Sequence, residues 1–393
     1  MSTRLFSRNA VLLAKIETTE GTDASPTGTA NAMLVSDLTI EPLAGSEVDL
    51  AYIRPYFGIS PSLRVEDYIT LSCTMDLAGT ATPGTAAPWG PLLRGCAFAE
   101  TLTAAAVTGA AQAGAASTIT LAAGASATDG TYVGATISYT TGGTNFGTSR
   151  IITAYNGTTK IATVHKAWDT PPAASSGYSI SANATYLPVS SSFESLTLYY
   201  NISGVRHKLL GAKGSVSLDL SANSRPALKF SYTGVYGGVA DAAEATPVYT
   251  AFQTPQTVGS ANTTALIAGK LADGSATGVQ LMKFDLDLAN AVKHRQLIGA
   301  AGVILTDRQP KGNVSLEATT VTFKDWFGDI RASTKYPLMV ENGLSAGNRV
   351  CVVLPNAQLS EPKYSDSDGI AMLDCAVRAI PLVANDEVRI VVK

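Results

Sequence analysis

The segment GVRHKLLGAKGSVSLD, residues 204–219, has a close counterpart further along the chain, in AVKHRQLIGAAGVILTDRQPKGNVSLE at residues 291–317. Each copy contains a basic–histidine–basic triplet, then a Leu-x-Gly-Ala block, then a Lys-Gly pair that leads into an alternating pattern. A strand-like segment precedes each copy, FESLTL in the first case and FDLDL in the second. Three blocks in the same order predict that the chain contains an internal duplication.

Alternation of apolar and polar residues recurs along the chain and predicts β-strands. A period of two places one face of a strand on a core and leaves the other face in water. The clearest examples lie at residues 215–220, 228–233, 284–289 and 388–392. Helical patterns are scarce, and the best candidates are two short segments, 89–98 and 324–333. The sequence therefore predicts a mainly β protein with many short strands joined by turns.

Composition argues against several classes of function. Charged residues make up 15% of the 393 residues and the net charge is -3, so no basic field supports nucleic acid binding as the primary role. No segment approaches the roughly 20 apolar residues of a membrane-spanning helix. Lys15 interrupts the apolar run near the N-terminus, so we expect no signal peptide and synthesis in a reducing cytoplasm. The four scattered cysteines fit no metal spacing and are expected to be buried free thiols.

Residues 102–182 differ in composition from the segments on either side. Between residues 100 and 150 the only charged side chain is that of Asp129, a composition that is also typical of a flexible linker. Strand-like segments nevertheless recur in this region, and Asn156-Gly157 between two of them is a strong hairpin signal. We interpret residues 102–182 as a compact all-β domain inserted into another domain.

The insertion and the duplication together predict three parts. With residues 102–182 set aside, the first domain consists of residues 1–101 plus 183–240. The second domain spans residues 245–393 and has a similar length. Each of these two domains is expected to contain one of the short helical segments.

His207 and His294 occupy matching positions in the two copies and are the first candidates for a reactive site. Each is flanked on both sides by Arg or Lys. A catalytic histidine needs an orienting acid and a nucleophile nearby, and no Ser or Cys partner stands at matching positions. Structural or interface roles are therefore predicted for both.

Two further motifs are weak. Residues 343–347, GLSAG, fit the G-x-S-x-G pattern around Ser345, which requires a strand before the serine and a helix after it. A strand pattern follows here, so a turn is predicted. Asp366-Ser367-Asp368-Gly369 resembles the start of a calcium loop but lacks the remaining oxygen ligands. We predict no catalytic residue, no cofactor, no metal site and no enzymatic activity.

The remaining pattern resembles the major tail tube proteins of long-tailed, siphovirus-like bacteriophages. Residues 8–40 resemble the N-terminal arm and first strand of that family, and residues 48–58 the long loop that follows. Residues 89–98 are similar to its short helix, and residues 193–236 to its later hairpins. Each motif has low specificity by itself, but the motifs occur together and in the order found in the family.

This resemblance implies a fold of two tandem tail-tube-type β-sandwich or split-barrel domains, each with a short helix, plus the inserted small all-β domain. In that family, six tube domains form a ring whose strands join into one barrel, and rings stack around a tape-measure protein before DNA passes through. Two domains in one chain imply a trimeric, pseudo-hexameric ring. The implied partners are other copies, the tape-measure protein, and tail tip and tail terminator proteins, in a virion tail assembled in the bacterial cytoplasm.

The resemblance also directs attention to the lining of the lumen. Because a basic lining would bind phosphate strongly, neutral or acidic strand faces are expected there. The candidate lining residues are Asp219, Asp285, Asp287 and Glu317, with Asp219 and Glu317 at matched positions of the repeat. An outer-surface location of these faces is an equal alternative.

Arg54, Pro55, Tyr56 and Phe57 form an aromatic-rich loop that is hard to bury in a small β core. We predict that this loop contacts the next ring. The inserted domain is expected to project from the outer wall, since both of its ends must emerge at a surface.

Two alternatives stay open at the level of sequence. A β-rich surface adhesin or carbohydrate-binding module would share the Thr/Gly/Ala-rich composition but usually carries an export signal. A hydrolase that uses Ser345 is the second alternative, and it rests on the pentapeptide motif alone.

Overall fold

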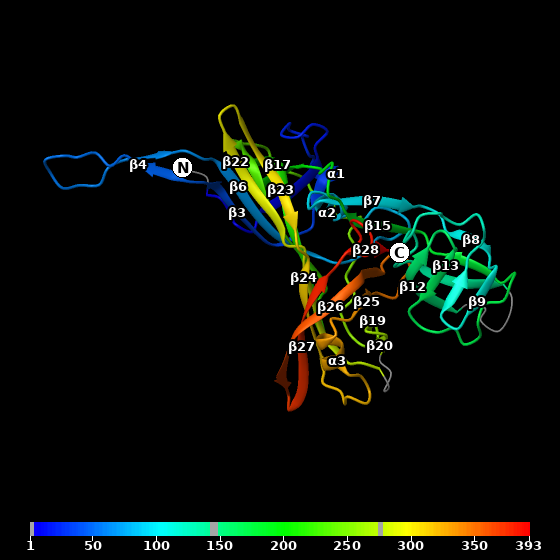
Figure 1. Ribbon diagram of the computed structural model, residues 1–393. Coiled ribbons are helices and arrows are strands. Elements are labelled where there is room, and N and C mark those ends of the chain that lie inside the picture. The colour runs from blue at the N-terminus through cyan, green and yellow to red at the C-terminus, as the bar shows by residue number, and fades with distance from the viewer. Residues whose placement is uncertain (1–3, 142–147, 274–277) are drawn as a thin grey trace.

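The computed structural model describes residues 4–141, 148–273 and 278–393. It is mainly β, with 51% of residues in strands and 4% in helices (Figure 1), which confirms the predicted fold class. Three short helices occur within these ranges. All four cysteines are free and buried, as the sequence predicted.

The first unit, residues 10–103 and 183–241, is built on an antiparallel sheet of six principal strands. In spatial order these strands are β1 (Ala10–Ile16), β16 (Leu196–Ile202), β17 (Val205–Ser221), β18 (Ala227–Asp241), β6 (Tyr68–Asp76) and β3 (Ser36–Ala44). Smaller elements of this unit are α1 (Gly28–Asn31), β2 (Ala32–Met33), α2 (Gly90–Arg94), β7 (Phe98–Thr103) and β15 (Asn183–Pro188).

The second unit, residues 263–392, repeats this topology. In spatial order its principal strands are β19 (Thr263–Ile267), β25 (Lys335–Asn342), β26 (Val350–Ser367), β27 (Ile370–Ala379), β24 (Lys311–Glu317) and β21 (Leu281–Asp287). In both units the spatial order is first, fourth, fifth, sixth, third and second along the chain, and a short helix follows the third strand. The smaller elements here are β20 (Lys270–Ala272), α3 (Trp326–Arg331) and β28 (Arg389–Val392).

The two histidine-containing segments are not equivalent in this shared topology, so the alignment that first indicated the duplication is wrong in detail. Residues 205–221 form one continuous strand, β17, the fifth of its unit. The counterpart is divided among β22 (Asn290–Leu297), β23 (Ala300–Arg308) and the third strand, β24. Asp219 and Glu317 therefore do not occupy matched positions.

A glycine in each Leu-x-Gly-Ala block explains the difference. Gly211 has φ +59° and lies where the register of β17 against β18 shifts, so it forms a bulge within a continuous strand. Gly299 has φ +90° and lies in the turn between β22 and β23, where the chain reverses. The same sequence block thus adopts two backbone conformations, a bulge within a strand at Gly211 and a turn between strands at Gly299.

A single apolar core runs through both units. In the second unit, Val340 and Val352 enter it from β25 and β26, while Val314 and Cys375 enter from β24 and β27. In each unit one long strand changes partners along its length. β17 pairs first with β16 and then with β21, and β26 pairs first with β25 and then with β27.

The insert, residues 107–180, forms a separate seven-stranded sheet. Its strands in spatial order are β8 (Val107–Ala110), β14 (Gly177–Ile180), β11 (Thr136–Thr141), β12 (Ser149–Asn156), β13 (Ile161–Val164), β10 (Thr118–Thr120) and β9 (Ala113–Ala115). It enters and leaves through β7 and β15, which pair with each other. The predicted hairpin at Asn156-Gly157 is present, since β12 pairs with β13, although four residues form its turn.

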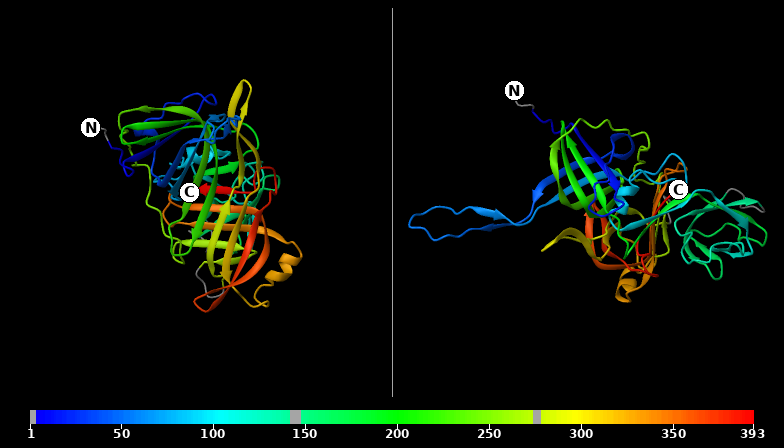
Figure 2. Two further views of the ribbon diagram at one scale, coloured as in Figure 1. Left: turned by 90° about the vertical axis from the view of Figure 1, so that its left-hand side faces the viewer. Right: turned by 90° about the horizontal axis from the view of Figure 1, so that it is seen from above.

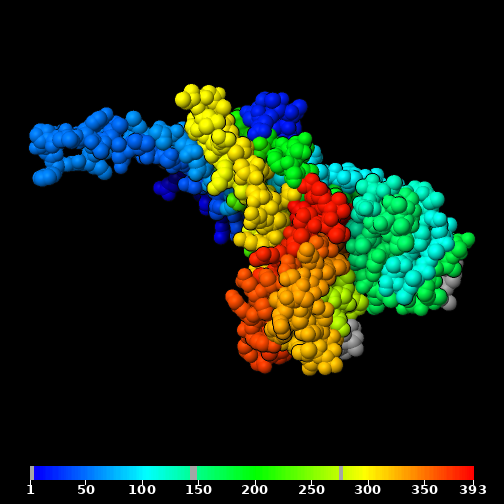
Figure 3. Space-filling view, viewed as in Figure 1, coloured from blue at the N-terminus to red at the C-terminus, as the bar shows by residue number. Residues whose placement is uncertain are grey.

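The core of the insert continues into the second unit. Met339, Cys351, Val353 and Val391 belong to the apolar cluster of the insert, whereas their neighbours along the same strands belong to the main core. The insert therefore packs on the outer face of β25, β26 and β28, as Figures 1 and 3 show on the right.

Candidate assembly surface

The two units join into one sheet through two strand pairs, β15 with β28 and β17 with β21. Residues Ser217–Ser221 of β17 pair antiparallel with Lys283–Asp287 of β21. This β17–β21 junction creates a continuous series, β3-β6-β18-β17-β21-β24-β27-β26. Figure 2, left, looks onto this surface, and the insert lies behind it. One face of the series covers the core, and we call the opposite face the polar face.

The structure brings the four predicted lumen residues onto the polar face. Asp219 lies directly opposite Asp285 across the β17–β21 junction. Asp287 lies opposite Lys311, and Glu317 is on the same face of β24 as Lys311. These carboxylates are gathered over three neighbouring strands, while the side chains between them along each strand are buried.

Lysines that the sequence analysis did not single out also lie on this face. Two carboxylates directly opposite each other destabilise a sheet unless cations lie nearby. The Nζ of Lys229 lies 3.5 Å from Asp219 Oδ2, and the Nζ of Lys283 lies 2.9 Å from Asp285 Oδ2. The hydrogen bond to Asp285 raises the pKa of Lys283. Both lysines stand in alternating segments, so their place on the polar face was available from the sequence.

The polar face is consequently mixed in charge. Next to the junction, the pKa of Asp374 is lowered by hydrogen bonds from Ser315 and Ser365. Arg378 lies opposite Lys311 on the same side. A face with alternating carboxylates, ammonium groups and hydroxyls offers no extended basic surface for phosphate.

Two strand edges at opposite ends of the eight-strand series are open. Among the described strands, β3 pairs with β6 alone. Residues Leu359–Ser367 of β26 pair with β27 alone, although the first half of β26 pairs with β25 and β28. In the first unit, the corresponding second half of β17 is the part that pairs with β21. The chain therefore makes one junction of this kind and leaves the two halves of another unpaired.

Apolar side chains distinguish the junction from these edges. At the junction, Leu218 and Leu286 lie opposite each other and are both buried. At the edge of β26, Tyr364 is 66% exposed and contacts the Phe327 ring at 5.9 Å. At the edge of β3, Leu43 is 45% exposed. Apolar side chains are thus covered at the β17–β21 junction and are exposed at the edges of β26 and β3.

The predicted contact loop is the most extended feature of the molecule. Residues 45–66 form an arm whose base is the hairpin of β4 (Glu47–Asp49) and β5 (Ser62–Arg64). The arm and the insert lie at opposite ends of the molecule in Figure 3. Arg54, Pro55, Tyr56 and Phe57 lie near its tip, where Phe57 is 108% exposed and Ile53 is 103% exposed.

Contacts at the base hold the arm in place. Arg64 forms an ion pair with Asp67 and donates to the backbone oxygens of Leu43 and Ala44. His294 Nδ1 lies 2.7 Å from Glu66 Oε1. Because His294 belongs to β22, the hairpin of the second unit supports the arm of the first.

His207 and His294 each lie beside a tyrosine ring. His294 stacks on the ring of Tyr68 at 5.0 Å, and His207 lies 6.0 Å from the ring of Tyr200. Burial lowers the pKa of His207. Within the described ranges, neither histidine forms a hydrogen bond with a Ser or Cys side chain. The structural role expected for them stays a prediction.

The two weak motifs are hairpin turns. Ser345 is exposed between β25 and β26, and a strand follows it instead of the helix that a nucleophile elbow requires. Asp366 accepts a hydrogen bond from the Gly369 amide in the turn between β26 and β27. The described residues contain no group of three His, Cys, Asp or Glu side chains that could hold a metal ion.

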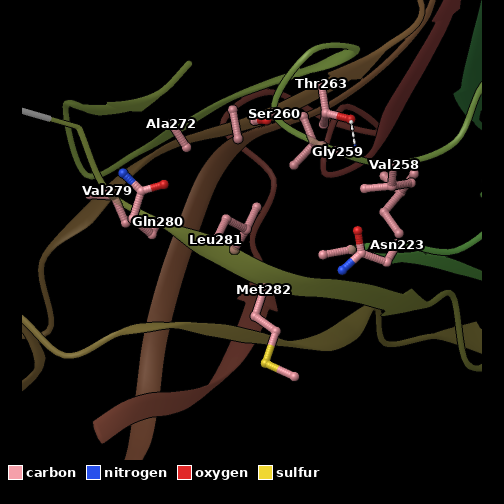
Figure 4. A pocket seen from close by; sticks show the side chains of 14 residues that line it. Asn223, Val258, Gly259, Ser260, Thr263, Ala272, Val279, Gln280, Leu281 and Met282 are labelled. Atoms are coloured by element: carbon pink, nitrogen blue, oxygen red, sulfur yellow. Dashed lines mark hydrogen bonds between the residues drawn. The ribbon is translucent and has the colours of Figure 1, made fainter. Parts of the chain in front are cut away.

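A small pocket lies beside β21, with a volume of about 150 Å³. Figure 4 shows that its lining includes Val258, Val279 and Leu281, together with the polar side chains of Asn223 and Thr263. The Thr263 hydroxyl accepts a hydrogen bond from the Gly259 amide. The described lining contains no acid, base or thiol.

No protein-family model matches the chain, and no curated protein is significantly similar to it. Across the residues described, no helix has the length and apolar character needed to cross a membrane.

Proposed function

We propose that this protein is a structural subunit of a bacteriophage tail tube, in which three copies form a pseudo-hexameric ring and rings stack around a tape-measure protein. One observation carries the proposal: the chain makes the β17–β21 junction internally and leaves the two strands of an equivalent junction, β26 and β3, open at opposite ends of the same sheet.

Addition of one copy to the next would pair these edges. The open half of β26 in one copy would lie beside β3 of its neighbour, as β17 lies beside β21 within the chain. Such a contact is heterologous, so it closes into a ring when the rotation per copy is suitable. Closure satisfies the backbone groups that an open edge exposes. Three copies with two units each would supply six units and six similar junctions.

The polar face would then line the ring. Its mixed charge, with Asp219 and Asp285 each beside a lysine, suits passage of DNA because phosphate finds no continuous basic track. The insert lies beyond the core from this face and would stand on the outer wall. The tape-measure protein would occupy the lumen during assembly, and tail tip and tail terminator proteins would cover the ends of the stack, in a virion tail assembled in the host cytoplasm.

The arm would connect successive rings. Its tip presents Tyr56 and Phe57 to solvent, and the Arg54 guanidinium lies 6.0 Å from the centroid of the Tyr56 ring. Exposed apolar surface of this kind favours burial in a neighbour. Arg54 and Pro55 lie in the same loop and would contribute to that contact.

Negative-stain microscopy and native mass measurement of concentrated protein test the proposal. We expect hollow, striated tubes and a ring species with the mass of three chains. Isolated particles that remain monomeric at every concentration would contradict it and would favour the adhesin or carbohydrate-binding alternative. A ring of six chains would retain the tube but overturn the pseudo-hexameric arrangement.

A further inference from the structure

A second and larger pocket lies between the insert and the second unit, with a volume of about 630 Å³. One wall comes from the insert, around Gly130 and Val133, and the other comes from the second unit, around Pro355 and Leu382. Strand β28, next to the label C in Figure 1, lies between the two parts. The pocket exists only because the insert is docked on the second unit.

Arg389 is the unusual residue of this pocket. It begins β28, in which Ile390 and Val392 enter the main core while Val391 enters the core of the insert. Alternation therefore directs Arg389 toward the insert. The residue is only 5% exposed, and its Nε has no hydrogen-bond partner in the described structure. Burial lowers the pKa of Arg389 to about 10.

The backbone of the insert makes room for this guanidinium group. Gly130 has φ +72°, and a Cβ atom at this position would lie 3.2 Å from Arg389 Nη2. A larger residue would therefore press on the guanidinium group. The Arg389 guanidinium group therefore lies close to the backbone of the insert at Gly130, but Gly130 offers it no anionic group.

The two carboxylates of the pocket are occupied elsewhere. Asp129 accepts a hydrogen bond from the Gly157 amide at 2.7 Å. Asp386 accepts from the amides of Leu382 and Val383 at 2.8 and 3.0 Å. Asp386 stabilises the charged form of Arg389 only through space. Among the described residues, the guanidinium group thus has no direct anionic partner.

We propose that this pocket binds a small monocarboxylic acid with an apolar body, whose carboxylate pairs with Arg389. An unpaired buried guanidinium is costly, and a carboxylate matches its donors with two parallel hydrogen bonds. The remaining lining is predominantly apolar and includes Val133, Leu187 and Pro337, which suits a hydrocarbon body. A dianion such as phosphate would find one cation and two nearby carboxylates, and it is disfavoured for that reason.

Isothermal titration calorimetry with decanoate and with 4-phenylbutyrate tests this proposal, and 1-decanol serves as the uncharged control. We expect saturable binding of at least one acid and at least about tenfold weaker binding of the alcohol, because a charge-assisted hydrogen bond is lost. Absence of binding by both acids, or equal binding of acid and alcohol, would overturn the proposal.

Substitutions locate the binding site. Arg389→Met keeps an unbranched side chain but removes the guanidinium group, and it is expected to reduce acid binding at least about tenfold. Arg225→Met, at an exposed arginine paired with Asp76, is the matched control and should bind as the parent does. Should Arg389→Met fail to fold, Val383→Glu at the exposed rim tests the same point, since its carboxylate would compete for Arg389, with Val383→Gln as control. Unchanged binding in Arg389→Met, or in Val383→Glu, would contradict the assignment.

Discussion

The β17–β21 junction and the two open edges involve equivalent strands of the two units. The strands β17 and β21 are paired with each other, whereas their equivalents β26 and β3 each have an open edge. At the junction, Leu218 and Leu286 are sealed between paired strands, and the facing carboxylates Asp219 and Asp285 are balanced by lysines. At the edges, Tyr364 and Leu43 remain uncovered. The comparison shows that the chain seals one junction itself, whereas the described strands leave the edges of β26 and β3 uncovered. We propose that a second copy covers these edges.

The largest effect is expected from damage to the internal junction. Phe284 of β21 is fully buried beside this junction. Phe284→Ala should lower the free energy of unfolding by about 3–5 kcal/mol, because a large aromatic side chain leaves a cavity. Chemical denaturation monitored by circular dichroism measures this loss. A change below about 1 kcal/mol would mean that the junction does not stabilise the monomer.

A second test concerns the insert, which lies apart from the junction, and measures how the stability of the protein depends on pH. Burial lowers the pKa of His165 in the insert from its ordinary 6.5 to about 4, and its Nδ1 accepts a hydrogen bond from the Ile151 amide. The folded state therefore favours the neutral imidazole. Its contribution to the free energy of unfolding is fully present above pH 6.5, and it falls by up to about 3 kcal/mol as the pH decreases toward 4.

Acid titration of stability in the parent and in His165→Asn measures this dependence. The asparagine variant retains a possible acceptor but does not titrate, so its stability should change less between pH 6.5 and 4. Identical acid profiles in the two proteins would exclude His165 as the cause.

A third test acts on the open edge alone. Tyr364→Ala should change monomer stability by no more than about 0.5 kcal/mol, because the side chain is mostly exposed. Assembly should weaken about 10- to 100-fold if the neighbour buries this ring, since burial of a large apolar side chain is worth about 1.5–3 kcal/mol. Sedimentation of polymer across a concentration series measures the effect. Tyr236→Ala, away from the edge, is the control, and equal assembly of the two variants would refute the edge assignment.

The smallest effect on the folded chain is expected in the arm. Arg54→Ala and Tyr56→Ala should leave monomer stability within about 0.5 kcal/mol of the parent, but they should shorten the tubes seen by microscopy. Ile298→Ala, at the exposed tip of the other hairpin, provides a matched comparison. Unchanged tube length and yield in both arm variants would remove the arm from the contact between rings.

Local alternation was sufficient to predict the fold class and which side chains share a face. Phe284 and Leu286 are buried while Asp285 and Asp287 lie on the polar face, as their period of two predicts. The lengths of the helices were overestimated, because α2 and α3 are shorter than the sequence segments that predicted them. The location of the polar face in a lumen stays a prediction.

Long-range pairing could not be derived from the same patterns. The Leu-x-Gly-Ala blocks are alike in sequence, yet Gly211 forms a bulge and Gly299 forms a turn, because the neighbouring strands determine which backbone solution is used. Arg389 is similar in this respect. The alternation of Val388, Ile390 and Val392 predicts that Arg389 faces water, but the insert covers that face.

The two hairpins between the second and third principal strands have diverged in length. One has become the extended arm at residues 45–66, and the other, β22–β23, carries the His294 that props the arm at Glu66. In a ring of three copies, long and short hairpins would alternate around the circumference. Successive rings could then engage in three equivalent rotational settings instead of six, so that fusing two units into one polypeptide would restrict how the stack can twist.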